Sequence, residues 1–143
     1  KYEIVADQDA WLQDTALETA SGILTAHPDV NVIITVNDGG TIGSTMAVQN
    51  AGLAEQIMVF GHDGSDQISS MILDDACPLQ AVVAQDPYGQ GYKAMSALIA
   101  AIQGGDYSAT QGKCEYLDGI VLSCRDKDFV NSWRVDNGLA EIG

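Results

Sequence analysis

Four loops in the sequence carry polar and aromatic residues of the types that bind a hydroxyl-rich small molecule. These residues are Trp11, Asn37 with Asp38, His62 with Asp63, and Gln85 with Asp86. Amides and carboxylates hydrogen-bond to neighbouring hydroxyl groups, and an indole ring covers the apolar face of a sugar. Small-molecule sites usually combine such an apolar surface with a few convergent polar groups. Together the four loops predict a binding site for a sugar or a related polyol.

Each of these residues also has a structural explanation when it is considered alone. Asn37 and Asp38 precede an expected helix and are of the types that cap helices; for Asp38, capping is the preferred interpretation. Asp63 stands before a glycine and fits a turn. His62 follows an apolar strand, where a histidine is usually a packed or hydrogen-bonded ring, and Trp11 is compatible with the core. The ligand site is favoured because all of these residues follow the ends of strands.

A buried strand precedes the second loop. Val32, Ile33, Ile34 and Val36 form an apolar, mostly β-branched run without alternation, which is typical of a strand covered on both faces of a parallel sheet. Further strands are expected at 2–6, 57–60 and 79–84, an extended stretch at 115–122, and helices at 12–26, 41–51, 68–72, 88–103 and 129–137. This alternation predicts an α/β fold with a parallel, helix-flanked sheet. The carboxyl ends of its strands share one edge, where ligands bind.

Composition excludes several classes of partner. The 143 residues are 46% hydrophobic and 18% charged, which suits one α/β domain. Six basic against twenty acidic side chains give a formal charge of −14, which opposes binding to nucleic acid or to anionic lipid. The acidic residues are scattered, as on a solvated surface. No apolar run has the length of a membrane span.

Motifs for catalysis, cofactors and metals are weak. The Gly39–Gly43 stretch lacks the G-x-G-x-x-G spacing, and neither a phosphate-binding P-loop nor a G-x-S-x-G elbow occurs. Cys77, Cys114 and Cys124 show no metal-ligand spacing, so a zinc site is not indicated, while one disulfide with an odd thiol is allowed. A Cys–His pair stays open, although no motif positions one. We therefore expect no enzyme activity, no metal and no cofactor.

Three stretches carry a family resemblance: HPDVNVIITVNDGG, IMVFGHDGS and LQAVVAQDPYGQGYKA. They resemble the C-terminal lobe of the type I periplasmic sugar-binding proteins, the ribose-, galactose- and allose-binding group of ABC transporters. The resemblance runs from about Tyr2 to about Val121 and implies a doubly wound sheet in an incomplete lobe. It also implies a non-catalytic solute-binding component that captures a monosaccharide or similar polyol in an interlobe cleft. Such a protein lies in the periplasm or on the cell surface as a lipoprotein, and its partner is an ABC permease.

The effector domains of lac repressor-type regulators share this fold and are the alternative. A basic helix-turn-helix encoded upstream would favour the regulator, whereas a signal peptide or lipobox cysteine would favour transport. In either case the resemblance places the ligand contacts on Trp11, Asn37, Asp63 and Gln85. Gln85 would also mark the hinge at which the chain crosses to the other lobe.

The resemblance further implies a division of the chain. Residues 1–85 would form the C-terminal lobe, 86–118 would belong to the other lobe with a helix at 88–103 and a strand near 113–117, and 119–143 would return. The chain would pass between the lobes at Gln85 and again at 118–119. If these two points are adjacent, Cys77 and Cys124 come within disulfide range and Cys114 stays single.

The chain also resembles a fragment, because the family's first strand and helix of this lobe have no counterpart. That strand would lie between the strands at 2–6 and 32–36. Both would then expose an open edge, so we expect self-association, a complementing chain, or a rearrangement in which the two strands meet.

Overall fold

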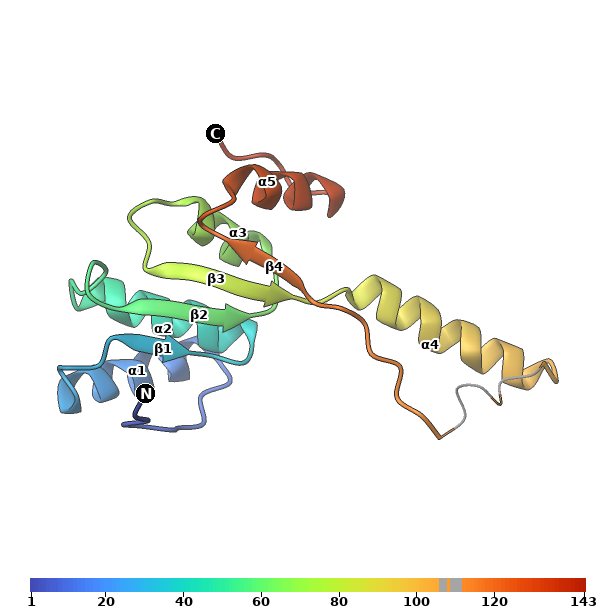
Figure 1. The fold of residues 1–143 in the computed structure, drawn as a ribbon, viewed down its shortest axis with the longest axis horizontal. Coiled ribbons are helices and arrows are strands. Elements are labelled where there is room, and N and C mark those ends of the chain that lie inside the picture. The colour runs from blue at the N-terminus through green and yellow to red at the C-terminus, as the bar shows by residue number, and fades with distance from the viewer. Residues whose placement is uncertain (106–107, 109–111) are drawn as a thin grey trace. The chain divides into compact units, whose positions relative to one another are not determined.

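The computed structural model describes residues 1–105, 108 and 112–143. In chain order its elements are α1 (Gln13–Ala26), β1 (Val32–Ile34), α2 (Asp38–Asn50), β2 (Met58–His62), α3 (Asp66–Leu73), β3 (Leu79–Ala84), α4 (Pro87–Ile102), β4 (Ile120–Ser123) and α5 (Lys127–Asp136) (Figure 1). The chain forms two compact units. The sheet unit contains Lys1–Ala84 and Val121–Gly143, and the helix unit contains Gln85–Ile120.

The strands form one sheet in the order β1-β2-β3-β4. β1 pairs with β2 in parallel, with Val32 opposite Met58, and β2 pairs with β3 in parallel, with His62 opposite Val83. β4 runs in the opposite direction along β3 (Figure 1), where the backbone amide of Cys124 donates a 3.0 Å hydrogen bond to the carbonyl of Gln80. The predicted α/β fold with a mostly parallel sheet is confirmed.

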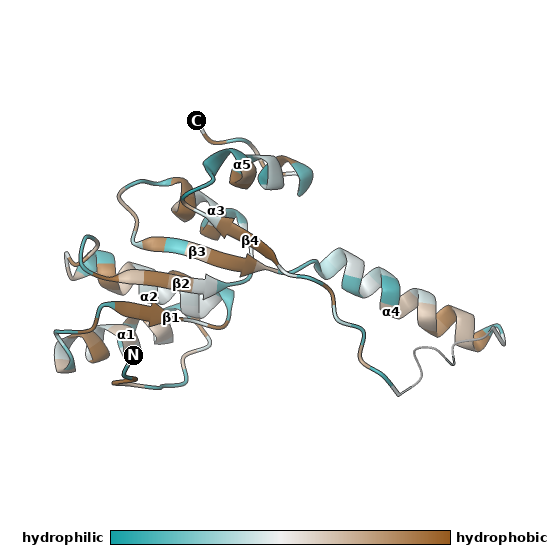
Figure 2. Cartoon of the chain, viewed as in Figure 1, coloured by the Kyte–Doolittle hydropathy of each residue, from teal (hydrophilic) through white to brown (hydrophobic). Residues whose placement is uncertain are grey.

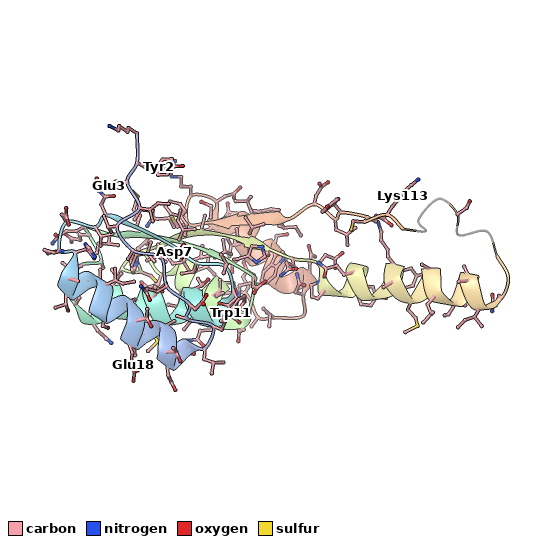
Figure 3. All side chains as sticks on the ribbon, turned by 90° about the horizontal axis from the view of Figure 1, so that it is seen from below. Tyr2, Glu3, Asp7, Trp11, Glu18 and Lys113 are labelled. Atoms are coloured by element: carbon pink, nitrogen blue, oxygen red, sulfur yellow. The ribbon has the colours of Figure 1, made fainter. Side chains whose placement is uncertain are left out.

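The core lies between the sheet and the helices on one of its faces. Val59, Val82 and Leu122 are at most 1% exposed, whereas Met58, the neighbour of Val59 in β2, is 46% exposed. Figure 3 shows α1 on one side of the strands, and Figure 2 shows that the strands are mostly hydrophobic. Packing of α1 on α2 depends on Gly43, where a Cβ atom would come 2.3 Å from the carbonyl oxygen of Gln13.

The N-terminal segment differs from its prediction. Residues 1–11 form neither strand nor helix, and Tyr2 and Ile4 are 87% and 73% exposed. A strand is stable only beside a hydrogen-bonded neighbour, and β1 is the edge of the sheet in the described part of the chain. The strand expected at 2–6 is therefore wrong for this structure. The rearrangement in which 2–6 meets 32–36 does not form either.

Side-chain caps set the starts of the helices. α2 begins at Asp38, three residues before the predicted start, because Oδ1 of Asn37 accepts a 2.9 Å hydrogen bond from the amide of Gly40. α3 begins after Ser65, whose Oγ accepts from the amide of Ile68 at 3.2 Å. Caps of this kind satisfy amides that have no partner within the helix.

A buried arginine attaches α5 to α3. The side chain of Arg134 is 4% exposed, and its Nη2 lies 2.7 Å from Oδ1 of Asp66. Its Nη1 donates to Oγ of Ser69 at 2.6 Å, and its Nε donates to the carbonyl of Ala140 at 2.8 Å. The neighbouring Trp133 is also buried. These contacts hold the C-terminal segment on the sheet unit.

The helix unit consists of α4 and the segment that follows it. Oδ1 of Asp86 accepts a 2.8 Å hydrogen bond from the amide of Gly89 and so caps α4. Lys93 forms an ion pair with Glu115. Residues 113–117 contain no strand, so the strand expected there is wrong. No residue of α4 is buried, and its C-terminal half is largely hydrophobic (Figure 2). Among the described residues, no helix combines the length and apolar character needed to cross a membrane.

All three cysteines are free thiols, so the expected Cys77–Cys124 disulfide is wrong. The register of β4 explains the difference. Cys124 lies opposite Gln80, and its thiol is 3.6 Å from Oε1 of that residue. Cys77 stands three residues earlier in the chain and is buried.

Candidate functional site

Asn37 connects two loops through its side-chain amide. Its Oδ1 caps α2, and its Nδ2 donates a 2.9 Å hydrogen bond to the backbone carbonyl of Trp11. The alternative that Asn37 caps the following helix is therefore confirmed. An amide has two donor hydrogens and two acceptor lone pairs, so these bonds leave one donor and one acceptor site for a ligand.

Asp63 lies in the loop after β2 with a backbone φ of 72°. Asp tolerates this left-handed conformation better than most residues do. Its Oδ2 accepts a 3.1 Å hydrogen bond from the amide of Asp38, and its Oδ1 lies 3.1 Å from Nδ1 of His62. The side chain is still 30% exposed, and a carboxylate has about four acceptor sites. A ligand hydroxyl group can therefore reach the Asp63 carboxylate.

Asp38 is the first residue of α2 and not its cap, so the capping role preferred for Asp38 is wrong. Burial raises the pKa of its carboxyl group above its ordinary value, and the charge of Asp63 raises it further. The hydroxyl of Ser65 donates to Oδ1 of Asp38 at 3.4 Å and partly opposes this shift of the pKa. Two carboxylates thus lie close together at the ends of β1 and β2.

Sequence reasoning missed the support beneath these carboxylates. Thr41 is fully buried, and its Oγ1 donates to the carbonyl of Asn37 at 2.7 Å and lies 2.8 Å from the hydroxyl of Thr35. The same oxygen accepts from the amide of His62 at 3.3 Å. A Cβ atom at Gly61 would lie 2.4 Å from Thr41. Two features of the sequence could have indicated this support. They are the polar residue Thr41 at a core-facing position of a helix and the glycine Gly61 near the end of a strand.

Trp11 and Gln85 complete the expected set of ligand contacts. Trp11 is 62% exposed and lies where the N-terminal segment meets α1 (Figure 3). Hydrogen bonds therefore connect the loops that carry Trp11, Asn37 and Asp63 within the sheet unit. Gln85 is the first residue of the helix unit, where its Oε1 accepts from Nε2 of Gln90 at 3.2 Å.

A groove of about 480 Å³ lies beside β1 and α1 and reaches Trp11 and Asn37, but its lining does not include Asp63. One wall is β1 with its flanking residues, and the other is the N-terminal segment; Trp11, Asn37 and Gly40 lie in its lining. Within the described ranges, no cluster of three or more His, Cys, Asp or Glu side chains has the arrangement of a metal site.

Comparison with known proteins supplies a family context. The model of the periplasmic binding protein domain matches residues 1–106. The D-allose-binding periplasmic protein of Escherichia coli (strain K12) is 32% identical over 106 residues, which are 73% of this chain and 33% of that protein. The ribose import binding protein RbsB of Salmonella typhimurium is 33% identical over 105 residues, which are 73% of this chain and 34% of the relative.

A solved structure has the same fold over most of the chain. It is an ABC transporter periplasmic solute binding protein from Actinobacillus succinogenes 130z with bound D-allose, with a TM-score of 0.78 and 30% sequence identity. The match covers 89% of this chain and 43% of that structure. The chain spans about a third of the length of the curated relatives named above.

Proposed function

Because this chain belongs to the periplasmic binding protein domain family, we propose that it is part of a solute-binding component of an ABC transporter. Its ligand is a monosaccharide or a similar polyol, and its role is capture without catalysis. The names of the allose- and ribose-binding relatives support this class of ligand. A component of this kind works outside the cytoplasm and delivers its ligand to a membrane permease.

The observation that carries the proposal is the hydrogen-bonded connection between three loops at one edge of the sheet. Trp11 is bonded to Asn37 at 2.9 Å, and the next residue, Asp38, is bonded to Asp63 at 3.1 Å. These bonds fix the amide of Asn37 and the carboxylate of Asp63 before a ligand arrives, and they hold the backbone that carries the Trp11 ring. A preorganised site loses less conformational entropy when it binds.

Each side chain then has a separate role. Asp63 accepts hydrogen bonds from ligand hydroxyl groups, and charge assistance makes these bonds the strongest of the set. The amide of Asn37 provides its remaining donor and acceptor. Trp11 stacks on the apolar face of the sugar ring. Gln85 lies in the helix unit, and its role as a ligand contact stays a prediction from the family resemblance.

The test is a titration of the isotope-labelled protein with D-allose, D-ribose and allitol, followed by NMR of its amide and indole N–H groups. Saturable shifts centred on the amides of Asp38 and Asp63 and on the indole N–H of Trp11 are expected. L-Leucine is the control, because it offers no array of hydroxyl groups. Equal shifts with leucine, or unchanged spectra at high sugar concentration, would contradict the proposal. Trp11→Ala should weaken the sugar response through loss of stacking.

A further inference from the structure

His62 is the last residue of β2, and hydrogen bonds hold the backbone around it. Its amide donates at 3.3 Å to Oγ1 of the buried Thr41, and the same hydroxyl oxygen lies 3.3 Å from the carbonyl oxygen of His62. In the neighbouring strand Val83 lies opposite His62, and the carbonyl of Val83 accepts a 2.9 Å hydrogen bond from the amide of Asp63. The imidazole ring of His62 is therefore attached to a backbone with little freedom to move.

The ring of His62 contacts one oxygen of the Asp63 carboxylate. Its Nδ1 lies 3.1 Å from Oδ1 of Asp63, while Oδ2 of the same carboxylate accepts the hydrogen bond from the amide of Asp38. One donor on each oxygen determines the rotation of a carboxylate about its Cβ–Cγ bond. The carboxylate of Asp63 is thus held in one orientation by donors from two different segments.

This contact also determines which nitrogen of the neutral ring carries the hydrogen. An ionised carboxylate only accepts hydrogen bonds, so Nδ1 of His62 must be the donor to Asp63. The neutral ring then has its hydrogen on Nδ1 and a lone pair on Nε2. Protonation adds a hydrogen at Nε2 and a positive charge, and it leaves the donor at Nδ1 in place.

The charges near the ring come from two carboxylates among the described residues. Asp63 is bonded to the ring, and Asp38 at the start of α2 is bonded to Asp63 through its amide. Thr41 of α2 and Val83 of β3, which also lie against His62, carry no charge. The side chain of His62 is 37% exposed, so the ring exchanges protons with solvent. An imidazole changes its charge between about pH 8 and pH 5, so pH sets the charge beside Asp63.

A positive charge on the ring makes Asp63 a weaker acceptor for a ligand. Hydrogen bonds to an ionised acceptor are about twice as strong as those between neutral groups. An imidazolium nitrogen 3.1 Å from Oδ1 offsets part of the carboxylate charge. Hydroxyl groups of a ligand then gain less from bonding to Asp63 than they do beside a neutral ring.

We propose that His62 is a positioning residue of the sugar site, and that protonation of its ring weakens sugar capture. In the neutral form, Nδ1–H holds the Asp63 carboxylate in place while the full negative charge is kept. Capture is therefore stronger at neutral than at acidic pH. This inference rests on the proposed function, because it takes Asp63 as the anchor of the ligand.

The first test uses the protein without ligand. NMR of the ring nitrogens in isotope-labelled protein at about pH 8 should show a neutral His62 with its hydrogen on Nδ1. The sequence contains two histidines, and the spectrum of His27→Asn identifies the signals of His62. A neutral ring with its hydrogen on Nε2 would overturn the proposal, because Nδ1 could not then donate to Asp63.

The second test is calorimetric titration at about pH 8 and about pH 5.5 with the tightest binder among D-allose, D-ribose and allitol. The wild type should bind about three- to tenfold more weakly at the lower pH. His62→Asn places a donor nitrogen at the same number of bonds from the backbone as Nδ1 but does not titrate. It should keep the wild-type affinity at the higher pH and lose the pH response. His62→Phe keeps a ring without a donor, and at the higher pH it should bind about three- to tenfold more weakly than the wild type.

Two further variants control for other groups that titrate. His27→Asn changes the residue that ends α1, and Asp38→Asn keeps the backbone amide that bonds to Asp63. Both should bind more weakly at the lower pH, as the wild type does.

The outcomes separate this inference from the proposed function. Sugar binding by the wild type with equal affinity at both pH values would overturn the inference alone. A full pH response in His62→Asn, or equal affinities of His62→Asn and His62→Phe at the higher pH, would do the same. Absence of sugar binding by the wild type at the higher pH would refute the proposed function, and this inference with it.

Discussion

The backbone amide of Asp38 donates a 3.1 Å hydrogen bond to Oδ2 of Asp63. This bond joins the start of α2 to the loop after β2 and holds a carboxylate at the edge of the sheet. It also brings the charge of Asp63 close enough to raise the pKa of the Asp38 carboxyl group. Asp63 also has a positive φ, and strained backbone conformations of this kind often accompany functional sites.

Asp38 should make stability depend on pH. A carboxyl group whose pKa is raised on folding contributes stability below its ordinary value of 3.8, and this contribution is lost as pH rises through the raised pKa. Asp38→Asn should therefore become more favourable, relative to the wild type, as pH rises from acid to neutral. Melting temperatures of both proteins across this range provide the test. Asp29→Asn, an exposed residue outside the helices and strands, controls for the loss of one negative charge, and an equal trend in it would contradict the prediction.

Asn37 should stabilise the fold through both ends of its amide. Asn37→Ala removes the cap of α2 and the bond to Trp11, so it should lower the free energy of unfolding by about 1–3 kcal/mol. Asn37→Asp keeps an acceptor for the amide of Gly40, but an ionised carboxylate cannot donate a hydrogen bond to the carbonyl of Trp11. The loss of unfolding free energy in Asn37→Asp should therefore be smaller at acidic pH, where the protonated carboxyl group can donate. Urea denaturation measures both values. A loss in Asn37→Ala of under about 0.5 kcal/mol, the low end for helix caps, would argue against the cap.

Gly61 should be required by its contact with Thr41. The 2.4 Å approach of an added Cβ atom to that buried side chain forces a shift in the core, and overpacking of this kind costs about 1–3 kcal/mol. Gly22→Ala is the matched control, since Gly22 lies inside α1 with open space around it and should stabilise the helix by about 0.5–1 kcal/mol. Chemical denaturation of Gly61→Ala and Gly22→Ala should give shifts of opposite sign. Stabilisation by Gly61→Ala would refute the packing argument.

Arg134 should be important for the attachment of α5. Its removal leaves the buried hydroxyl of Ser69 without this donor, and breaking a buried ion pair typically costs about 3–5 kcal/mol. Because the side chain of Asp66 is 67% exposed, the loss for Arg134→Ala should be near the lower end. Arg134→Lys keeps the charge but not the planar fork of donors, and it should recover only part of the stability. Full recovery in urea denaturation would show that charge alone is sufficient.

The sequence predicted the order of the helices and of strands β1 to β3 well, but the expectation that the strand at Val32 is covered on both faces is wrong, because Ile34 and Val36 are 76% and 69% exposed. Apolar side chains recur every three or four residues in 12–26 and 88–103. This spacing indicates helices directly, because it places the apolar side chains on one face of a helix. The strand at 2–6 was mispredicted because pairing depends on a neighbour that local sequence does not contain. The Cys77–Cys124 pairing failed for a related reason, since the register of β4 is a tertiary property.

The sequence indicated which residues to consider for the candidate site, but it did not indicate the hydrogen bonds between them. Asn37 and Asp63 follow β1 and β2, whose carboxyl ends share one edge of the parallel sheet, whereas Trp11 was selected from a strand at 2–6 that does not form. The bond from Asn37 to Trp11 spans two loops, and the support from Thr41 depends on the packing of α2 on β2. Neither follows from a local pattern.

Calorimetric titration of Asp63→Asn with the sugar that gives the strongest NMR response tests the assignment of the site most directly. Asparagine tolerates the left-handed backbone and keeps an acceptor for the amide of Asp38, so the fold should persist while the charge is lost. Affinity should fall by about 1.5–3 kcal/mol, or roughly ten- to over a hundredfold, with Asp29→Asn unchanged. An affinity of Asp63→Asn within about twofold of the wild type would show that Asp63 does not anchor the ligand.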